Sequence, residues 1–326
     1  MSNDAKTTLP DAAALATAES LVRTVMAPTP LYRWPQIEAR LGSEVWVKHE
    51  NHGPLGAFKV RGGLTYLAGL RRREPDCRGV IAATRGNHGQ SIAFAAARQG
   101  LRAVILVPQG NSKEKNAAMR ALGAELIEAG TDFQEALEEA QARARQEGLH
   151  PVPSFHGDLV AGVATCGLEM LRAAPQLTRV YVPIGLGSGI CAVAAARAAL
   201  GLDFELVGIV SAGATAYRDS LALGTPVSRP VDTRLADGMA CRTPDPEALT
   251  LIEQQVARVV TVTDAEIAEA MRLYFAATHN VAEGAGAAAL AAALQEGAGP
   301  DDRLGLVLSG GNIDSDLFCE VLAGKI

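Results

Sequence analysis

Short runs of β-branched and other apolar residues alternate along the chain with longer, alanine-rich stretches of helical period. This alternation is typical of parallel strands that are joined by helices and covered by helices on both faces. We therefore predict the α/β class, with parallel-rich sheets flanked by helices. A strongly alanine-biased stretch at 285–298 indicates a tightly packed helix. The predicted strands are 45–47, 80–82, 103–107, 125–127, 180–184, 206–210 and 304–308, and the other predicted helices are 59–72, 88–99, 113–122, 133–147, 190–200 and 263–278.

The composition excludes several classes of protein. Hydrophobic residues make up 48% of the 326 positions and charged residues 20%, which is typical of a globular chain with a sizeable core. A formal net charge of -6 without any basic run argues against a nucleic-acid partner. The 5 cysteines are far apart with no CxxC spacing, so neither a zinc site nor a disulfide framework is predicted. Without a signal region or an apolar run approaching about 20 residues, we expect a cytoplasmic protein that does not enter a membrane.

The segment 56–63, Gly-Ala-Phe-Lys-Val-Arg-Gly-Gly, surrounds the most informative lysine of the chain. Lys59 follows an aromatic residue, has small residues nearby and opens a predicted helix. A lysine that forms a Schiff base must be held still and partly dehydrated, so that its amine can lose a proton and a flat cofactor can approach it. A solvated lysine on a helix face needs no such surroundings. The segment therefore indicates Schiff-base chemistry at Lys59.

Three loops follow predicted strands, at the edge where open parallel sheets bind ligands. They are Ala-Thr-Arg-Gly-Asn-His-Gly-Gln at 83–90, Pro-Ile-Gly-Leu-Gly-Ser-Gly at 183–189 and Ser-Gly-Gly-Asn at 309–312. Each precedes a predicted helix start, where free N–H groups and the helix dipole favour an anion. The second loop is the predicted phosphate site, because glycines let the backbone close around an oxyanion. A tight turn without a ligand is the alternative.

Two other nucleotide motifs do not fit the loop at 183–189. Its spacing is G-x-G-x-G, and the next predicted strand ends at Ser211, whereas a dinucleotide site needs an acidic residue there for the ribose. A Walker loop is excluded because no Gly-Lys-Ser/Thr follows. A cofactor with a single phosphate fits better.

These four segments together resemble the motifs of the fold-type-II pyridoxal phosphate enzymes, and the match is closest to the threonine/serine dehydratase and serine racemase branch. The segment with Lys59 resembles the Ser-Phe-Lys-x-Arg-Gly-Ala motif of that family. The three loops resemble, in chain order, its Ser-x-Gly-Asn-His motif, its tetraglycine phosphate loop and its Ser-Gly-Gly-Asn motif. The resemblance implies a two-lobed fold similar to tryptophan synthase β, and a homodimer. It also implies a large cofactor-binding domain at 1–55 and 156–326 and a small substrate-side domain at 56–155.

The resemblance assigns roles to individual residues. Lys59 would carry pyridoxal 5′-phosphate and act as the base at the substrate Cα. Ser309 would face the pyridine nitrogen, where a hydroxyl does not hold a proton as an aspartate does, which favours β-elimination over transamination. The resemblance places Phe58 beside the cofactor ring, Asn87 at its O3′, Gly185, Leu186, Gly187, Ser188 and Gly189 at the phosphate, Gly238 and Glu283 near the ring, and Thr84, Gly86 and His88 around the substrate carboxylate.

Arg85 departs from the family motif. The family often has serine or alanine there, and in racemases the serine is the second base. A guanidinium is always protonated in practice, so racemisation is disfavoured. Arg85 would bind an acidic or polar group of the substrate, or it would turn away and pair with a surface carboxylate. The stretch 210–216 also lacks the two carboxylates with which racemase-like members bind a divalent cation, so no metal site is predicted.

Three further residues have alternative interpretations. His88 either fixes its loop or transfers a proton. Glu283 either lies beside the cofactor or caps a helix. His156, with its neighbour Asp158, is interpreted as part of the crossing between the lobes rather than as a catalytic group.

The resemblance implies a reaction class. We expect a pyridoxal-phosphate-dependent ammonia-lyase that dehydrates a small β-hydroxy amino acid, L-threonine or L-serine, to a 2-oxo acid and ammonia. A first alternative is a hydroxyectoine-utilisation dehydratase that acts on a longer hydroxylated diamino acid, because such proteins look similar in the Arg85 loop and in Gly-Leu-Gly-Ser-Gly. A catalytically silent ligand-binding relative is an alternative of another class. The chain stops soon after Ser309, so a short, catabolic type without an effector domain is expected.

Overall fold

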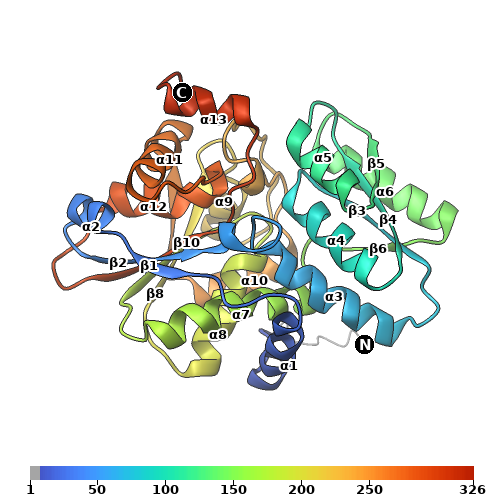
Figure 1. Cartoon of the computed structure of the whole chain (residues 1–326), viewed down its shortest axis with the longest axis horizontal. Coiled ribbons are helices and arrows are strands. Elements are labelled where there is room, and N and C mark those ends of the chain that lie inside the picture. The colour runs from blue at the N-terminus through green and yellow to red at the C-terminus, as the bar shows by residue number, and fades with distance from the viewer. Residues whose placement is uncertain (1–7) are drawn as a thin grey trace.

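Two groups of elements, each built around its own sheet, make up the computed structural model, which describes residues 8–326 (Figure 1). The larger sheet has the strand order β1-β2-β10-β7-β8-β9. Its edge pair β1–β2 is antiparallel and its other pairs are parallel. The strands are β1 (Leu31–Arg33), β2 (Glu44–His49), β10 (Arg303–Leu308), β7 (Arg179–Pro183), β8 (Glu205–Ser211) and β9 (Arg258–Val262).

Helices cover both faces of the larger sheet (Figure 1). Successive residues of a strand point to opposite faces, so Val180 and Val182 of β7 pack with one set of helices and Tyr181 packs with the other. The first set is α1 (Ala12–Arg23), α7 (Gly157–Ala173), α8 (Ser188–Leu200) and α10 (Pro246–Gln255). The second set is α2 (Pro35–Leu41), α11 (Asp264–Thr278), α12 (Gly284–Glu296) and α13 (Ser315–Leu322). The remaining elements of this group are α9 (Ala216–Leu223) and the short 3₁₀ helices η1 (Glu50–His52) and η2 (Asp237–Met239).

The smaller sheet is parallel throughout, in the order β5-β4-β3-β6. Val80 and Ala82 of β3 face one core, and Ile81 and Ala83 face another. The strands are β3 (Gly79–Ala83), β4 (Arg102–Val107), β5 (Glu125–Glu128) and β6 (His150–Pro151). Helices α3 (Lys59–Arg73), α4 (Asn87–Arg98) and α5 (Lys113–Ala121) cover the first face, and α6 (Phe133–Glu147) covers the second.

Every strand and helix that the sequence pattern predicts is present, and the predicted α/β class is confirmed. The alanine-biased stretch forms α12, which is buried along most of its length. The pattern missed several elements, among them α7 and β9. Helix α7 is buried on nearly all sides, so it lacks the polar face that marks an amphipathic helix. Strand β9 lies at a sheet edge and is only half buried.

Close packing of α3 against α7 joins the two groups. A Cβ atom at Gly162 of α7 would collide with the Arg61 carbonyl and with Thr65 Oγ1 of α3. A Cβ atom at Gly62 of α3 would lie 2.9 Å from the Leu159 carbonyl of α7. The glycines therefore let the two helices approach backbone to backbone. This contact places the first turn of α3, which begins with the predicted Schiff-base lysine, against the larger sheet.

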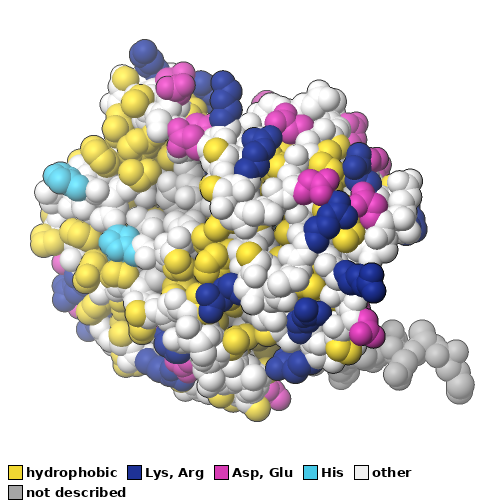
Figure 2. Space-filling model, turned by 45° about the vertical axis from the view of Figure 1, so that its right-hand side comes forward, with side chains coloured by type: hydrophobic (Ala, Val, Ile, Leu, Met, Phe, Trp, Pro, Cys, Tyr) yellow, Lys and Arg dark blue, Asp and Glu magenta, His cyan; other side chains and the backbone are white. Residues whose placement is uncertain are grey.

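Charged side chains of both signs are interspersed on the face shown in Figure 2. Many exposed charged side chains of the protein form ion pairs, as Arg102 does with Glu125 at 2.7 Å and with Glu147 at 2.8 Å. Exposed pairs of this kind contribute little to stability. No helix within residues 8–326 combines the length and apolar character that crossing a bilayer requires.

Candidate active site

A pocket lies between the two groups of elements, beside the carboxyl ends of β3, β7 and β10. Its volume is about 1050 Å³, including the part that is open to solvent. The structure brings every site residue predicted from the sequence to this pocket, while their individual roles stay predictions. These lining residues are Phe58, Lys59, Thr84, Arg85, Gly86, Asn87, His88, Gly185, Leu186, Gly187, Ser188, Gly189, Gly238, Glu283 and Ser309.

Lys59 is the first residue of α3, and its amine faces the pocket. Nζ donates a hydrogen bond to Ser188 Oγ at 2.8 Å and lies 4.9 Å from the centre of the Phe58 ring. Part of the side chain stays exposed to the open pocket, but the surrounding protein atoms dehydrate the amine. This burial lowers the pKa of Lys59 from 10.5 to about 8. With this pKa roughly a tenth of the amine is neutral at pH 7, far more than for an ordinary lysine, and a nucleophile or base requires the neutral form.

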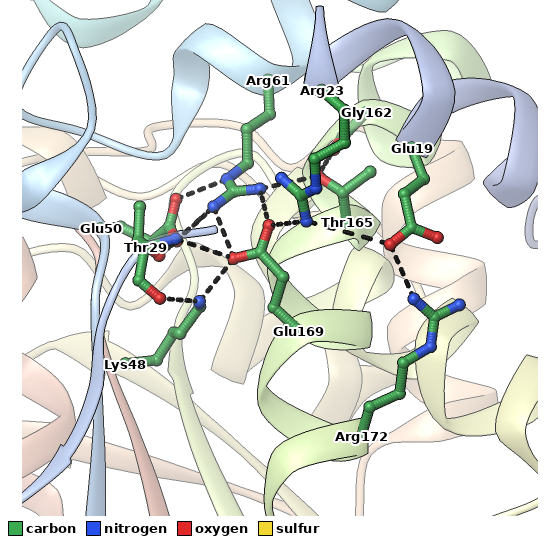
Figure 3. A network of polar contacts seen from close by, with 10 residues as sticks. All are labelled: Glu19, Arg23, Thr29, Lys48, Glu50, Arg61, Gly162, Thr165, Glu169 and Arg172. Carbon is green, nitrogen blue, oxygen red and sulfur yellow. Dashed lines mark hydrogen bonds and ion pairs between the residues drawn. The ribbon is translucent and has the colours of Figure 1, made fainter. Parts of the chain in front are cut away.

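A buried arginine anchors the helix turn that carries Lys59 (Figure 3). Arg61 is fully buried and donates from Nε to Glu50 Oε2 at 2.7 Å and from Nη1 to Glu169 Oε1 at 2.6 Å. Glu50 belongs to η1 and Glu169 to α7. The first turn of α3 is thus held by charged groups from two other parts of the fold.

Further donors satisfy both carboxylates (Figure 3). Lys48 Nζ donates to Glu169 at 2.5 Å, and Thr29 Oγ1 donates to Glu50 at 2.5 Å. Burial acts to raise the pKa of Glu169, but the hydrogen bonds and charges of Arg61 and Lys48 outweigh it and lower the pKa to about 2. The same competition lowers the pKa of Glu50. Both groups are therefore charged at neutral pH. Sequence reasoning missed this network, although Arg61 lies within the segment that identified Lys59.

The glycine loop 183–189 leads directly into α8. Gly187 is the N-cap residue and has φ +95, a left-handed conformation that favours glycine. A Cβ atom at Gly185 would lie 2.5 Å from the Gly238 carbonyl, so the loop needs glycine there for close approach of the two backbones. Ser188 is the first residue of α8. The free N–H groups of this helix start, together with the helix dipole, make the loop a suitable anion site.

The loop 309–312 is tied to the segment that contains Lys59. The Phe58 N–H donates to the Ser309 carbonyl at 3.0 Å, and the Gly311 N–H donates to the Gly56 carbonyl at 2.9 Å. Gly56 has φ +66, and a Cβ atom there would lie 2.6 Å from Asn312 Oδ1. The end of β10 therefore positions both Ser309 and the entry into α3.

Asn87 and Glu283 are joined by a direct hydrogen bond, from Asn87 Nδ2 to Glu283 Oε1 at 2.6 Å. Lys115 Nζ donates to Glu283 Oε2 at 3.1 Å and to Asp237 Oδ2 at 2.6 Å. Glu283 stands at the N-cap of α12, but its side chain makes no capping hydrogen bond, so the helix-capping interpretation is wrong. Burial raises the pKa of Glu283, yet each oxygen accepts from a donor, which favours the ionised form. The sequence indicated Asn87 and Glu283 but not Lys115.

The loop 84–88 is fixed by Thr84. Its Oγ1 accepts hydrogen bonds from the N–H groups of Gly86 at 2.9 Å and Gly89 at 3.2 Å. Arg85 forms no ion pair with any carboxylate of residues 8–326, so the predicted alternative of a surface ion pair is not observed. Its Nε is buried and has no hydrogen-bond partner in that range. Arg85 is thus a cation of the pocket that pairs with no carboxylate of the described residues.

His88 is neutral in this pocket. Burial, and then the charge of Lys59, lower its pKa to about 3. Its Nε2 is buried without a partner among the described residues. Because Thr84 makes the hydrogen bonds that hold the loop, the interpretation that His88 fixes it finds no support.

Two predicted non-catalytic residues lie elsewhere. His156 Nδ1 caps α7 by accepting from the Asp158 N–H at 3.0 Å. The Asp158 carboxylate pairs with Arg73 of α3 at 2.5 Å. Both residues therefore belong to the α3–α7 contact between the groups, as predicted.

The model of the pyridoxal-phosphate dependent enzyme family matches residues 22–310 of the chain. The chain belongs to this family. It is accordingly an enzyme that uses pyridoxal 5′-phosphate, and the predicted cofactor is confirmed.

Curated relatives and solved structures are similar to most of the chain. It is 35% identical over 299 residues to the L-threonine ammonia-lyase of Geobacter sulfurreducens, a match that covers 91% of this chain and 74% of that protein. The crystal structure of a threonine deaminase from T.th. has 31% identity and a TM-score of 0.86, covering 94% of this chain and 99% of that one. A pyridoxal 5′-phosphate-dependent aspartate racemase has 26% identity and a TM-score of 0.88, covering 94% and 97%. The chain spans 56% of the length of two longer curated relatives.

The pocket of this family member fits the cofactor. A partly dehydrated lysine amine faces it, and a glycine loop opens a helix beside that amine. Buried nitrogen atoms of Arg85 and His88 line the same pocket without partners in the described residues. Within residues 8–326 no group of three or more His, Cys, Asp or Glu side chains is placed to hold a metal ion.

Proposed function

We propose that the protein removes water and ammonia from a small β-hydroxy amino acid, L-threonine or L-serine, and yields a 2-oxo acid. The observation that carries the proposal is the pKa of Lys59, which burial lowers to about 8. Arg85 and Arg242 also line the pocket, but a guanidinium is a poor base. Burial acts to lower the pKa of Lys115, but the charges of two carboxylates outweigh it and raise that pKa. Racemisation needs a second proton-transfer group of comparable pKa, whereas elimination needs one base. The proton-transfer groups of the pocket therefore favour elimination over racemisation.

Lys59 is the proposed base at the substrate Cα. Pyridoxal 5′-phosphate, when bound, supplies a sink for the electron pair that the Cα–H bond releases. The proton goes to Lys59 Nζ and the bond between Cβ and the hydroxyl oxygen breaks. The proton with which the hydroxyl leaves as water would come from the phosphate of the bound cofactor, so one proton is gained by Lys59 and one is given up. The unsaturated amine that results takes up one water molecule and yields the 2-oxo acid and ammonia. The atoms of the overall reaction balance, because one water molecule leaves the substrate and one is taken up when ammonia is released.

Other lining residues are proposed to bind and orient. The N–H groups at Gly185, Gly187, Ser188 and Gly189 would hold the cofactor phosphate, together with the adjoining Leu186. Phe58 and Gly238 would bound the cofactor ring. Asn87 would donate a hydrogen bond to O3′ of the cofactor, and the Glu283 carboxylate would lie near the cofactor ring. Ser309 would face the ring nitrogen. Thr84, Gly86 and His88 would surround the substrate carboxylate, with Arg85 nearby.

The similar proteins support threonine as the substrate, because two of them are named for acting on it. Arg85 favours a second candidate, a longer β-hydroxy amino acid with an additional carboxylate or acyl oxygen. The diamino acid of hydroxyectoine utilisation fits this candidate only in acylated form, because a free second ammonium would be repelled by the guanidinium.

We also propose a cytoplasmic homodimer with domains at 1–55 plus 156–326 and at 56–155.

A panel assay tests this function. The purified protein, loaded with pyridoxal 5′-phosphate, is given L-threonine, L-serine, 3-hydroxyaspartate and phenylserine. We expect stoichiometric release of 2-oxo acid and ammonia from at least one of them, with no gain of the opposite enantiomer in the unreacted substrate. Enantiomer exchange without ammonia release would instead assign a racemase, and a fully loaded protein that is inert on all four would contradict the proposal.

Arg85→Ser separates the two candidate substrates. If Arg85 binds a distal carboxylate, kcat/KM for 3-hydroxyaspartate falls roughly 10- to 100-fold, the range expected for a charge-assisted hydrogen bond in a pocket, while that for L-threonine changes less than about threefold. Arg120→Ser is the matched control, because Arg120 is exposed on α5. An equal change for both substrates would mean that Arg85 does not select the substrate side chain.

A further inference from the structure

We propose that Lys115 is a positioning residue of the cofactor site: its ammonium keeps Glu283 as a carboxylate, and Glu283 in turn fixes the orientation of the Asn87 amide. The same ammonium ties α5 to the elements of the larger sheet at the edge of the pocket. The proposal concerns how the site is held together and does not depend on which amino acid is the substrate.

Lys115 is buried and pairs with two carboxylates. Its side chain is 6% exposed, and its Nζ lies 2.6 Å from Asp237 Oδ2 and 3.1 Å from Glu283 Oε2. The Glu283 side chain is 2% exposed. An ammonium group has donors only and a carboxylate has acceptors only. Lys115 is therefore held in its charged form by two carboxylates and does not serve as a second base in the pocket.

The hydrogen bonds around Glu283 converge on its carboxylate, from Lys115 on one side and from Asn87 on the other. Glu283 Oε1 accepts from Asn87 Nδ2 at 2.6 Å, and Asn87 Oδ1 accepts from Asn312 Nδ2 at 2.8 Å. Asn312 Nδ2 also donates to the Leu55 carbonyl at 2.8 Å. The Glu283 carboxylate and the Leu55 carbonyl can only accept, so the amide nitrogen of Asn87 faces the first and that of Asn312 faces the second. Asn87 keeps one N–H of its amide nitrogen free for a ligand of the pocket.

The orientation of Asn87 depends on the charge of Glu283. A carboxylate can only accept, so it requires the amide nitrogen of Asn87 on its side. A protonated glutamic acid can also donate, so it would accept the amide oxygen on its side, and the hydrogen bond from Asn312 Nδ2 would be left as the contact that opposes this orientation. The charged groups facing Glu283 are Lys115 from α5 and Asp237 from η2. Without Lys115 the remaining neighbour is another acid, and both the burial and the like charge would drive Glu283 to bind a proton.

Lys115 also contacts the loop predicted to lie at the substrate. A Cβ atom at Gly86 would collide with Lys115 Cδ, so the alkyl chain of the lysine lies directly against that loop. The start of α5 is held in the same way: Ser112 Oγ donates to Asp314 Oδ1 at 2.6 Å, and the N–H of Glu114 donates to the same oxygen at 3.1 Å. Helix α5 thus meets the segments before α12 and α13 through hydrogen bonds and one buried ion pair.

The test measures cofactor binding rather than turnover. Cofactor-free protein is titrated with pyridoxal 5′-phosphate, and the Kd and the visible absorbance of the loaded protein are followed between pH 6 and 9. Lys115→Met removes the charge at nearly constant length. We expect it to raise the Kd roughly tenfold or more and to make the absorbance depend on pH where that of the unaltered protein does not, because breaking a buried pair leaves Glu283 free to protonate.

Three further variants decide between charge and packing. Lys115→Arg should keep the Kd within about threefold, since it retains the charge. Glu283→Gln should restore most of the affinity lost in Lys115→Met when the two are combined, because the neutral amide needs no counter-charge. Lys113→Met, at an exposed position of the same helix, is the control.

The proposal is overturned if Lys115→Met binds the cofactor as tightly as the unaltered protein, or if its loss is the same in the Glu283→Gln background. If Lys115→Met does not fold, folding of the double variant supports the proposal, and failure of both to fold overturns it. Activity plays no part in these measurements, so an error in the proposed substrate would leave them unchanged.

Discussion

Lys59→Ala is expected to reduce 2-oxo acid release by at least about 10³-fold on every substrate, because it removes both the nucleophile and the base from the pocket. The variant should still bind the cofactor phosphate, but the spectrum of the loaded protein should be that of a carbonyl compound held without a covalent bond. Steady-state assays and visible absorbance measure the two effects.

The matched control for this variant is Lys113→Ala. Lys113 is exposed in the first turn of α5, so its loss should leave both readouts unaltered. Thermal unfolding of the two variants shows whether each is folded. Dehydration by Lys59→Ala within about tenfold of the unaltered protein would refute the role of Lys59, because a general base alone contributes roughly 10²- to 10⁴-fold.

Arg61→Met is expected to lower the free energy of unfolding by roughly 3–5 kcal/mol, the cost of breaking a buried ion pair by removing one partner. Glu50 and Glu169 would then be left in the interior with too few donors. Urea unfolding of the cofactor-free protein measures the change. Arg40→Met is the control, since Arg40 pairs with Glu269 at an exposed site and should change stability by less than about 1 kcal/mol.

The dependence of stability on pH gives an independent check of the same network. The folded-state pKa of Glu169 is about 2, below its ordinary value of 4.5, so its contribution is fully present above about pH 4.5. That contribution is lost as the pH falls from 4.5 towards 2. Glu169→Gln should therefore lose less stability over this range than the unaltered protein does. Equal acid sensitivity of the two proteins, or an Arg61→Met variant as stable as the Arg40→Met control, would show that the network does not stabilise the fold.

Much of the fold could be predicted from local sequence patterns. Strand and helix periods are properties of neighbouring residues, so β7 and α8 could be predicted from 180–200 without knowledge of their partners. Helix α7 could not, because it is buried all round and its glycines serve contact with α3. Such a helix has no polar face from which to recognise it.

Within the site, the predictable residues were those with a conformational or motif signature. Gly185 and Gly187 belong to a glycine-rich motif, and the structure shows that a close backbone approach and a left-handed φ require glycine at these positions. Lys59 is marked by the small residues around it. Arg85 was recognised as unusual, but whether it pairs with a carboxylate was open, and the structure decided that it does not among residues 8–326. The homodimer, the cytoplasmic location, the domain limits and the role of each site residue stay predictions.

By itself the sequence determined the α/β class, the cofactor and the lysine that lines the pocket, because each is marked by local patterns and short motifs. Only the tertiary structure decided which charges meet. Lys115 is separated from Asp237 by 122 positions and from Glu283 by 168, and Arg61 is separated from Glu169 by 108. No local pattern marks these pairs, since the energy of a buried charge depends on the partner that folding brings to it.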